Sequence, residues 1–199
     1  MLKRDLSAAH SVRRLTRVVA GLGVCGVLLI ASGSAQAASA ATGSTTCTGV
    51  ILLREITSNL TVPAGATCFL GGAIIDGNVT VGQGSDFFAQ RELGRLTVIK
   101  GNLSTEGADE VEVTLAVVDG NASFDGTSGN IVTDCGFVSV CLFDVSFGGN
   151  VSITNTSPAG AELGFNVVRR DLTCLGNSSI TDIGGNAVQG QAFGQCAGI

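Results

Sequence analysis

The chain has 199 residues, which suits one domain, and the part after a predicted export signal at residues 1–37 carries 6 basic against 15 acidic side chains. An acidic surface of this kind repels nucleic acids and anionic lipids, so neither is an expected partner. The only histidine is His10, inside the export signal, and the whole chain lacks Trp and Tyr. This composition excludes an imidazole base, His-containing zinc sites and Trp or Tyr platforms for sugars, and we expect no catalytic residue, metal or cofactor.

Residues 1–37 have the features of a secretory signal peptide in the usual order. A basic head is followed by an apolar run over residues 18–31 and by the small-residue cleavage site Ala35-Gln36-Ala37. The apolar run is too short for a transmembrane helix, so we expect no membrane span after cleavage near Ala37. Residues 11–15 loosely resemble a twin-arginine signal. Cys25 could alternatively be read as a lipid-anchor cysteine, although the Val that precedes it is bulky for such a site. We expect a protein that is secreted or held in the cell envelope.

A five-residue motif recurs through the rest of the chain, after a Ser-, Thr- and Ala-rich segment at 38–46 that we expect to be flexible. The motif is Gly-Asn followed by alternating apolar and polar side chains, as in Gly77-Asn78-Val79-Thr80-Val81. Its Asn or Asp falls at positions 59, 78, 102, 121, 150, 171 and 186, in steps of 19, 24, 19, 29, 21 and 15 residues. A period near 20 indicates small units that bury their apolar faces by stacking on one another.

The composition of each unit predicts β-strands. A second apolar run of strand length precedes each motif, for example residues 96–99 and 115–118, and no helical apolar period occurs after residue 37. Gly and Asn tolerate left-handed backbone angles, so we expect the dipeptide to form a sharp corner between two strands, with a loop closing the coil. The sequence therefore predicts an all-β, single-domain parallel β-solenoid over residues 47–199, with about six to seven coils.

Stacked coils lie roughly 4.8 Å apart and place equivalent residues in columns. We expect two inward apolar columns, one through Val79 and Leu103 and the other through Val81 and Phe124. The corner asparagines should form an amide ladder that also satisfies backbone groups of the turns, although a repeated Asn could instead bind a ligand. The predicted ladder consists of Asn59, Asn78, Asn102, Asn121, Asn150 and Asn186.

Six cysteines follow the export signal, and an even number in an exported chain predicts disulfides. Cys47 and Cys68 are 21 residues apart, and Cys174 and Cys196 are 22 apart, about one coil in each case. Residues one coil apart stack at a distance that suits a disulfide, so we expect both pairs to fasten the end coils. Covered ends favour a discrete monomer over a filament. Cys135–Cys141 should close a local loop, with a redox or metal-binding pair as the alternative.

The step of 29 residues between Asn121 and Asn150 predicts an insertion of about eight residues in one coil, which is either a functional protrusion or a tolerated loop. The position before Gly-Asn holds Asp76, Lys100 and Asp119 in successive coils, followed by Gly148 and Arg169. We interpret this column as a surface ion ladder, with a cation or sugar site as the alternative. The acidic residues Asp109, Glu110 and Glu112 are expected in a solvated loop.

Three segments carry a family resemblance: residues 63–68, the Gly-Asn-Val-Thr-Val repeats, and the Cys-bounded tail from Cys174 to Cys196. Together they resemble small secreted proteins of high-GC Gram-positive bacteria, and the likeness covers nearly all of the chain after the export signal. The resemblance implies a right-handed parallel β-helix and an extracellular location, but no activity. The long Cys135–Cys141 coil, and Arg170-Asp171 in place of Gly-Asn, depart from the regular pattern.

Three functional hypotheses follow. We favour a non-enzymatic, exported interaction module with an extracellular or cell-wall partner, which meets that partner through a flat sheet face or the long coil. A polysaccharide lyase or hydrolase is the second hypothesis, with Asp76 and Asp119 as acid and base about 9.6 Å apart. The third is an ice- or surface-binding solenoid. Its hydroxyl column would comprise Thr61, Thr80, Ser104, Ser123, Ser152 and Thr173.

Overall fold

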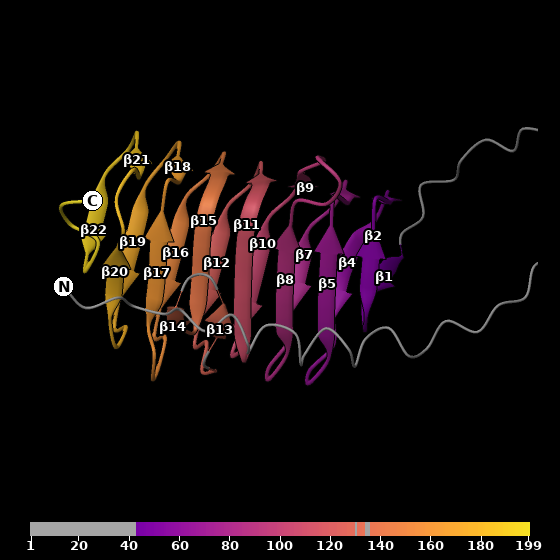
Figure 1. Cartoon of the computed structure of the whole chain (residues 1–199), viewed down its shortest axis with the longest axis horizontal. Helices are drawn as coiled ribbons and strands as arrows, with labels where there is room; N and C mark the ends of the chain where they lie inside the picture. Colours follow the sequence, from indigo (N-terminus) through magenta and orange to yellow (C-terminus); the bar gives the residue numbers. More distant parts are fainter. Residues whose placement is uncertain (1–42, 130, 134–135) are drawn as a thin grey trace, which may run out of the picture. The chain divides into compact units, whose positions relative to one another are not determined.

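Each Gly-Asn motif leads into a short parallel strand in which buried and solvent-facing side chains alternate. In the computed structural model, which describes residues 43–129, 131–133 and 136–199, these strands stack in register. Val79 pairs with Leu103, and Leu103 pairs with Ala122. The predicted parallel β-solenoid is therefore confirmed, with about seven turns and no helix among the described residues (Figure 1). No described helix is long and apolar enough to cross a membrane.

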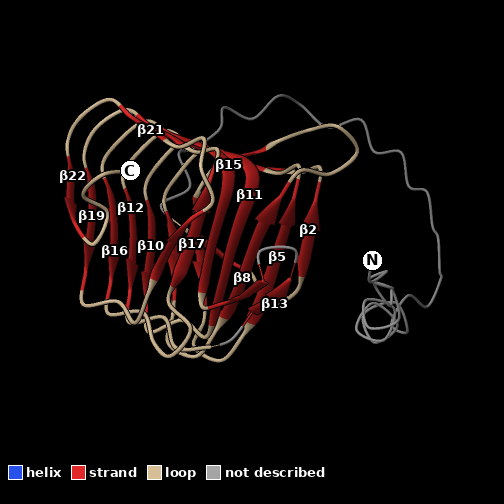
Figure 2. Cartoon of the chain, turned by 60° about the vertical axis from the view of Figure 1, so that its left-hand side comes forward, coloured by secondary structure: helices blue, strands red, loops and turns tan. Residues whose placement is uncertain are grey.

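Every full coil has three sides, here called faces A, B and C. Face A is an 8-stranded sheet, whereas faces B and C form one 12-stranded sheet because β11 and β15 run through both. Figure 2 shows strands of face A (β10, β12, β16, β19) and of face B (β5, β8, β17) on different sides of the coils. Face A comprises β1 (Ser44–Thr46), β4 (Asn59–Val62), β7 (Val79–Val81), β10 (Leu103–Glu106), β12 (Ala122–Asp125), β16 (Val151–Thr154), β19 (Leu172–Leu175) and β22 (Ala192–Gly194). Face B comprises β2 (Val50–Leu52), β5 (Thr67–Gly71), β8 (Asp86–Gln90), the first halves of β11 (Glu110–Val118) and β15 (Val140–Phe147), β17 (Ala161–Gly164) and β20 (Ile180–Asp182). Face C comprises β3 (Glu55–Ile56), β6 (Ile74–Ile75), β9 (Thr97–Ile99), the second halves of β11 and β15, β18 (Val167–Val168) and β21 (Ala187–Val188).

The sequence predicted the strands of faces A and C, but placed face B in loops. Residues 110–113 of β11 pair with β8, and residues 116–118 pair with β9. Leu115 stands between these two halves with φ of 49°, and Asp144 bends β15 in the same way with φ of 53°. Most of the described non-glycine residues with left-handed backbone lie where face B meets face C, and this conformation is strained for them.

The glycines of the Gly-Asn corners serve a different purpose from the one predicted. Gly77, Gly101, Gly120 and Gly149 all lack a positive φ. A Cβ on Gly101 would instead lie 2.6 Å from Oδ1 of Asn78 in the preceding coil, and a Cβ on Gly120 would lie 2.6 Å from Oδ1 of Asn102. The corner needs glycine because successive coils approach too closely for any side chain, and the expectation of left-handed angles at this corner was wrong.

The core is a set of stacked columns. The two columns expected from the sequence, through Val79 and Leu103 and through Val81 and Phe124, are fully buried. Thr105 lies between Val81 and Phe124 in the second column, and its hydroxyl has no hydrogen-bond partner among the described residues.

Disulfides close both ends of the described stack. Cys47–Cys68 joins the first two coils with a Cα–Cα distance of 5.6 Å, and Cys174–Cys196 joins the last two at 5.3 Å. Both predicted pairs are confirmed. The first coil begins earlier than expected, since β1 at Ser44–Thr46 already pairs with β4. The predicted signal peptide, residues 1–37, lies outside the described residues, as do residues 38–42.

The insertion between β12 and β15 folds into a hairpin of its own. Its strands β13 (Ile131–Thr133) and β14 (Gly136–Val138) pair antiparallel. Val138 at its end packs with Cys141 and Phe143 of β15, in a small cluster separate from the main core. Cys141 is buried and disulfide-bonded, while Cys135, its predicted partner, lies outside the described residues. The hairpin leaves the coils undisturbed, because β12 pairs with β16 and β11 pairs with β15 in unbroken parallel register.

Candidate functional site

A single column of hydroxyl groups runs along the outer side of face A. The strand registers pair Thr61 with Thr80, Thr80 with Ser104 and Ser104 with Ser123. Because coils repeat at about 4.8 Å, the hydroxyls form a regular row on a flat surface. The row extends by one coil beyond the six predicted residues, since Thr46 pairs with Thr61. Its members are Thr46, Thr61, Thr80, Ser104, Ser123, Ser152 and Thr173.

The corner asparagines border this row and form a ladder through their side-chain oxygens. Oδ1 of Asn59 accepts a 2.8 Å hydrogen bond from the backbone N–H of Asn78, and Oδ1 of Asn78 accepts one of 2.8 Å from that of Asn102. The same bond continues through Asn121 and Asn150. The ladder thus consists of side-chain-to-backbone bonds, with one direct amide contact of 3.2 Å between Asn102 and Asn78.

Asn186 does not belong to this ladder, contrary to the prediction. Asp171 accepts from Gln191 in the last coil, so Gly190-Gln191 takes the corner position there. Asn186 lies instead in a second, partly buried Asn pair, where its Oδ1 accepts a 2.9 Å hydrogen bond from the backbone N–H of Asn166. Asn166 in turn accepts from the backbone N–H of Val145, 3.0 Å away. The short step of 15 residues had a physical cause: the Asn at 186 belongs to a different corner.

The column before Gly-Asn contains one ion pair. Nζ of Lys100 lies 2.6 Å from Oδ1 of Asp76. The hydrogen bond and charge of Asp76, with smaller contributions from Glu55 and Asp119, raise the pKa of Lys100 above its ordinary value. The predicted ion ladder is therefore a Lys100–Asp76 pair with Asp119 one coil further on. The lysine between the two carboxylates does not suit an acid–base pair, which requires two carboxylates facing one substrate bond.

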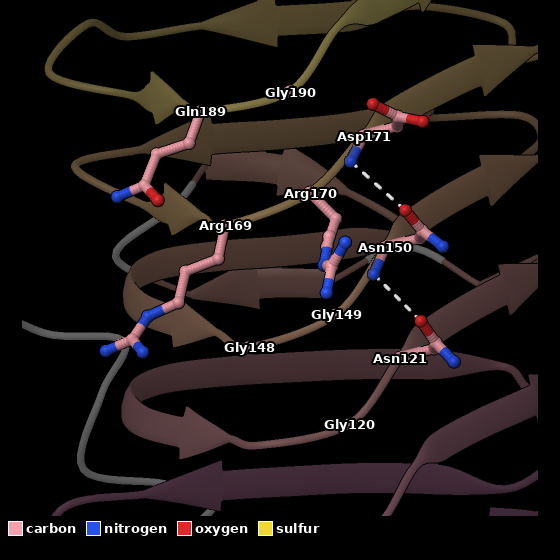
Figure 3. A pocket seen from close by; sticks show the side chains of 10 residues that line it. All are labelled: Gly120, Asn121, Gly148, Gly149, Asn150, Arg169, Arg170, Asp171, Gln189 and Gly190. Atoms are coloured by element: carbon pink, nitrogen blue, oxygen red, sulfur yellow. Dashed lines mark hydrogen bonds between the residues drawn. The ribbon is translucent and has the colours of Figure 1, made fainter.

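An open hollow of about 770 Å³ lies further along the same corner. Its floor is backbone, because Gly120, Gly148 and Gly149 carry no side chains (Figure 3). Two exposed arginines, Arg169 and Arg170, extend from the next coil toward the level of Gly148 and Gly149. Asn121, Asn150, Asp171, Gln189 and Gly190 complete the lining. The sequence signal for this feature is the departure from Gly-Asn at Arg170-Asp171, which by itself does not predict a hollow.

Face B also contains a buried carboxylate that the sequence did not predict. Glu112 is only 8% exposed and accepts a 2.5 Å hydrogen bond from Nε2 of Gln90, so its prediction as a solvated loop residue was wrong. Glu112 and Glu162 flank Cys141 in one outward column. Burial raises the pKa of Glu162 above its ordinary value. On the opposite side of the coil, hydrogen bonds from Thr154 and Asn155 lower the pKa of Asp125.

The start of face B is apolar on its outside. Val50 and Leu52 are about half exposed, and Val50 stacks on Phe69, which stacks on Phe88. Leu93, in the turn after β8, is 80% exposed. Exposed apolar surface of this kind is typical of contacts with other proteins. Nowhere in the described residues do three His, Cys, Asp or Glu side chains gather as metal ligands do.

Comparisons with protein-family models, with curated proteins and with solved structures found no match to this chain.

Proposed function

We propose that this protein is an exported, non-enzymatic interaction module of the cell envelope or extracellular space, and that face A meets its partner. The hydroxyl row on face A carries the proposal. It offers seven Ser or Thr side chains in successive coils, bordered by the Asn ladder. A flat array of donors and acceptors matches an extended, hydroxyl-rich polymer better than a compact small molecule, which binds in enclosed pockets.

Binding rather than turnover is supported by the chemistry available. Outside the predicted export signal the chain has no histidine, and Asp76, the first candidate acid, is paired with Lys100. A reducing-sugar assay on acidic polysaccharides tests this directly. Turnover that disappears in Asp76→Asn would replace the proposal with the lyase or hydrolase hypothesis.

The binding experiment compares two Thr→Tyr substitutions at exposed outward strand positions. Thr80→Tyr raises a bulky ring from the middle of the hydroxyl row, whereas Thr181→Tyr makes the same change on face B. The secreted protein is incubated with insoluble peptidoglycan, cellulose and chitin, and the bound fraction is measured. We expect Thr80→Tyr to weaken binding at least about fivefold and Thr181→Tyr to leave it unchanged. Equal effects of both substitutions, or no binding of any polymer, would reject face A as the contact surface.

An ice- or surface-binding role is the second candidate, favoured by the regular spacing of the same row. Thermal hysteresis of the wild-type protein, abolished in Thr80→Tyr, would support it. The hydroxyl row is one residue wide, since the neighbouring outward column holds Glu106, Asp125 and Thr154.

A further inference from the structure

We propose that Arg169 and Arg170 bind an oxyanion, carboxylate or phosphate, carried by an acidic polymer that lies along face A. This inference rests on the proposed function and adds the chemical class of the ligand. The hollow adjoins face A directly, because Asn150 in its lining is followed by Val151 and Ser152 of β16. A polymer in contact with the hydroxyl row at Ser152 therefore passes the two arginines.

The charge distribution singles out these two residues. Arg169 and Arg170 are the only basic residues after Lys100, in a part of the chain that is otherwise acidic. Neither forms an ion pair with a described residue, although Asp171 is adjacent in sequence. A guanidinium group without an ion pair keeps its full charge and its N–H fork for an anionic ligand.

The hollow exists because the stack forbids side chains in its floor. A Cβ on Gly149 would lie 2.5 Å from Oδ1 of Asn121, and a Cβ on Gly148 would collide with the carbonyl oxygen of Asp119. The floor must therefore remain glycine. Figure 3 shows the side chain of Arg170 ending close above Gly149, whereas that of Arg169 extends further out beyond Gly148. The space between and above these two glycines is the binding volume that we assign to the anion.

The other residues that line the hollow supply hydrogen-bond donors, and the one carboxylate among them, that of Asp171, already accepts a hydrogen bond. Asn121 and Asn150 use their Oδ1 atoms as acceptors in the ladder, and their amide NH2 groups form no hydrogen bond with a described residue. Oδ1 of Asp171 accepts a 2.9 Å hydrogen bond from the backbone N–H of Gln191. In Figure 3 the Asp171 carboxylate lies toward Gly190, whereas Arg170 extends toward Gly149.

Arginine suits this ligand because its planar fork of N–H groups matches the oxygens of a carboxylate or a phosphate. Neutral sugars carry no anionic oxygen and form no charged pair with arginine, and the hydroxyl row would contact them without the arginines. The site should thus distinguish acidic polymers from neutral ones of similar size.

The test measures binding of the secreted protein to polygalacturonate, to polyphosphate and to neutral dextran at low and moderate salt. Arg169→Gln/Arg170→Gln removes the proposed site. Arg91→Gln/Arg95→Gln removes the same charge from an exposed turn between β8 and β9, and is the matched control. A third variant, Arg169→Lys/Arg170→Lys, keeps the charge but loses the fork. Thermal unfolding of each variant confirms that the fold is intact.

We expect the Gln variant at the hollow to lose at least about tenfold in affinity for one acidic polymer, and the control less than about twofold. Loss for polygalacturonate assigns a carboxylate ligand, and loss for polyphosphate a phosphate. The affinity of the Lys variant for that polymer should lie between those of the wild-type protein and the Gln variant at the hollow. Equal losses of affinity in the hollow variant and the control variant would show that only net charge matters, and would overturn the inference. Acidic and neutral polymers that bind equally, with no effect of the hollow variant, would overturn it while leaving face A as the contact surface. If no polymer binds, both proposals fail.

Discussion

The backbone N–H of Asn102 donates a 2.8 Å hydrogen bond to Oδ1 of Asn78, which is 24 residues earlier in sequence and one coil away. The same geometry leaves no room for a Cβ on Gly101, which would lie 2.6 Å from that oxygen. Glycine and asparagine together thus fix the spacing of the coils at this corner and the hydrogen bonding of its backbone.

Gly101→Ala should therefore destabilise the fold strongly. The added methyl group would collide with backbone as well as with Asn78, so neighbouring coils must separate at the corner, at a cost of about 2–3 kcal/mol. Gly49→Ala is the control, because its Cβ would have no atom within 4 Å and its φ is not positive. This control should be neutral or stabilising by up to about 1 kcal/mol. Denaturant unfolding measures both, and equal stability of the two variants would contradict the close-approach explanation.

The ladder needs an acceptor but not an amide. Asn121→Leu leaves the backbone N–H of Asn150 without its partner and should cost about 1 kcal/mol, since the site is near solvent. Asn121→Asp keeps an acceptor oxygen and should be nearly neutral, as Asp171 already fills this role against Gln191. Thermal unfolding of both variants decides the point. Equal destabilisation by the two variants would contradict the role of Oδ1 as the required acceptor.

Removal of the last disulfide should loosen the final coil first. Cys174→Ser/Cys196→Ser releases a closed loop of 22 residues, which corresponds to about 3 kcal/mol in the chain-entropy account. Hydrogen exchange should show faster exchange in β19–β22 and little change in β4–β10. Uniform acceleration along the whole chain would indicate instead that the solenoid unfolds as a single cooperative unit.

Two carboxyl groups should give opposite pH dependences. The pKa of Asp125 is lowered by hydrogen bonds from Thr154 and Asn155, so its stabilisation is present above the ordinary pKa of aspartate and is lost as the pH falls through the lowered value. The pKa of Glu162 is raised by burial, so its ionisation destabilises the fold as the pH rises through the raised value. Asp125→Asn should reduce stability at neutral pH and converge with wild type in acid. Glu162→Gln should increase stability at neutral pH and converge with wild type in acid. The measurement is the midpoint of thermal unfolding against pH, and a pH-independent difference for either variant would contradict its assignment.

The repeat predicted the fold because it reports directly on stacking. The Gly-Asn spacing placed Cys47 beside Cys68 and Cys174 beside Cys196, and residues such as Val79 and Leu103 in one buried column. Face B escaped prediction for two physical reasons. Its strands carry polar residues, as in Asp86–Gln90, and β11 continues from face B into face C through a left-handed residue, Leu115, with no Gly or Pro to mark the bend.

The candidate site was harder to predict than the fold. Arg170 interrupts the Gly-Asn pattern, but it faces a floor of glycines from the preceding coil only in the folded chain. Asn186 was assigned to the wrong ladder because Asn serves at two different corners, and local sequence does not say which corner a given Asn occupies. Glu112 was taken as solvated because its neighbours, Gln90 through a hydrogen bond and Cys141 in the adjacent strand, are 22 and 29 residues away in sequence.

The β13–β14 hairpin shows how freely one corner of this scaffold accepts extra chain. Its two strands pair with each other, while the parallel pairing of β12 with β16 continues in register. A foreign peptide inserted between β12 and β15 would accordingly leave the parallel strand pairing of the coils in place. The natural chain thus already contains an attachment point for engineering.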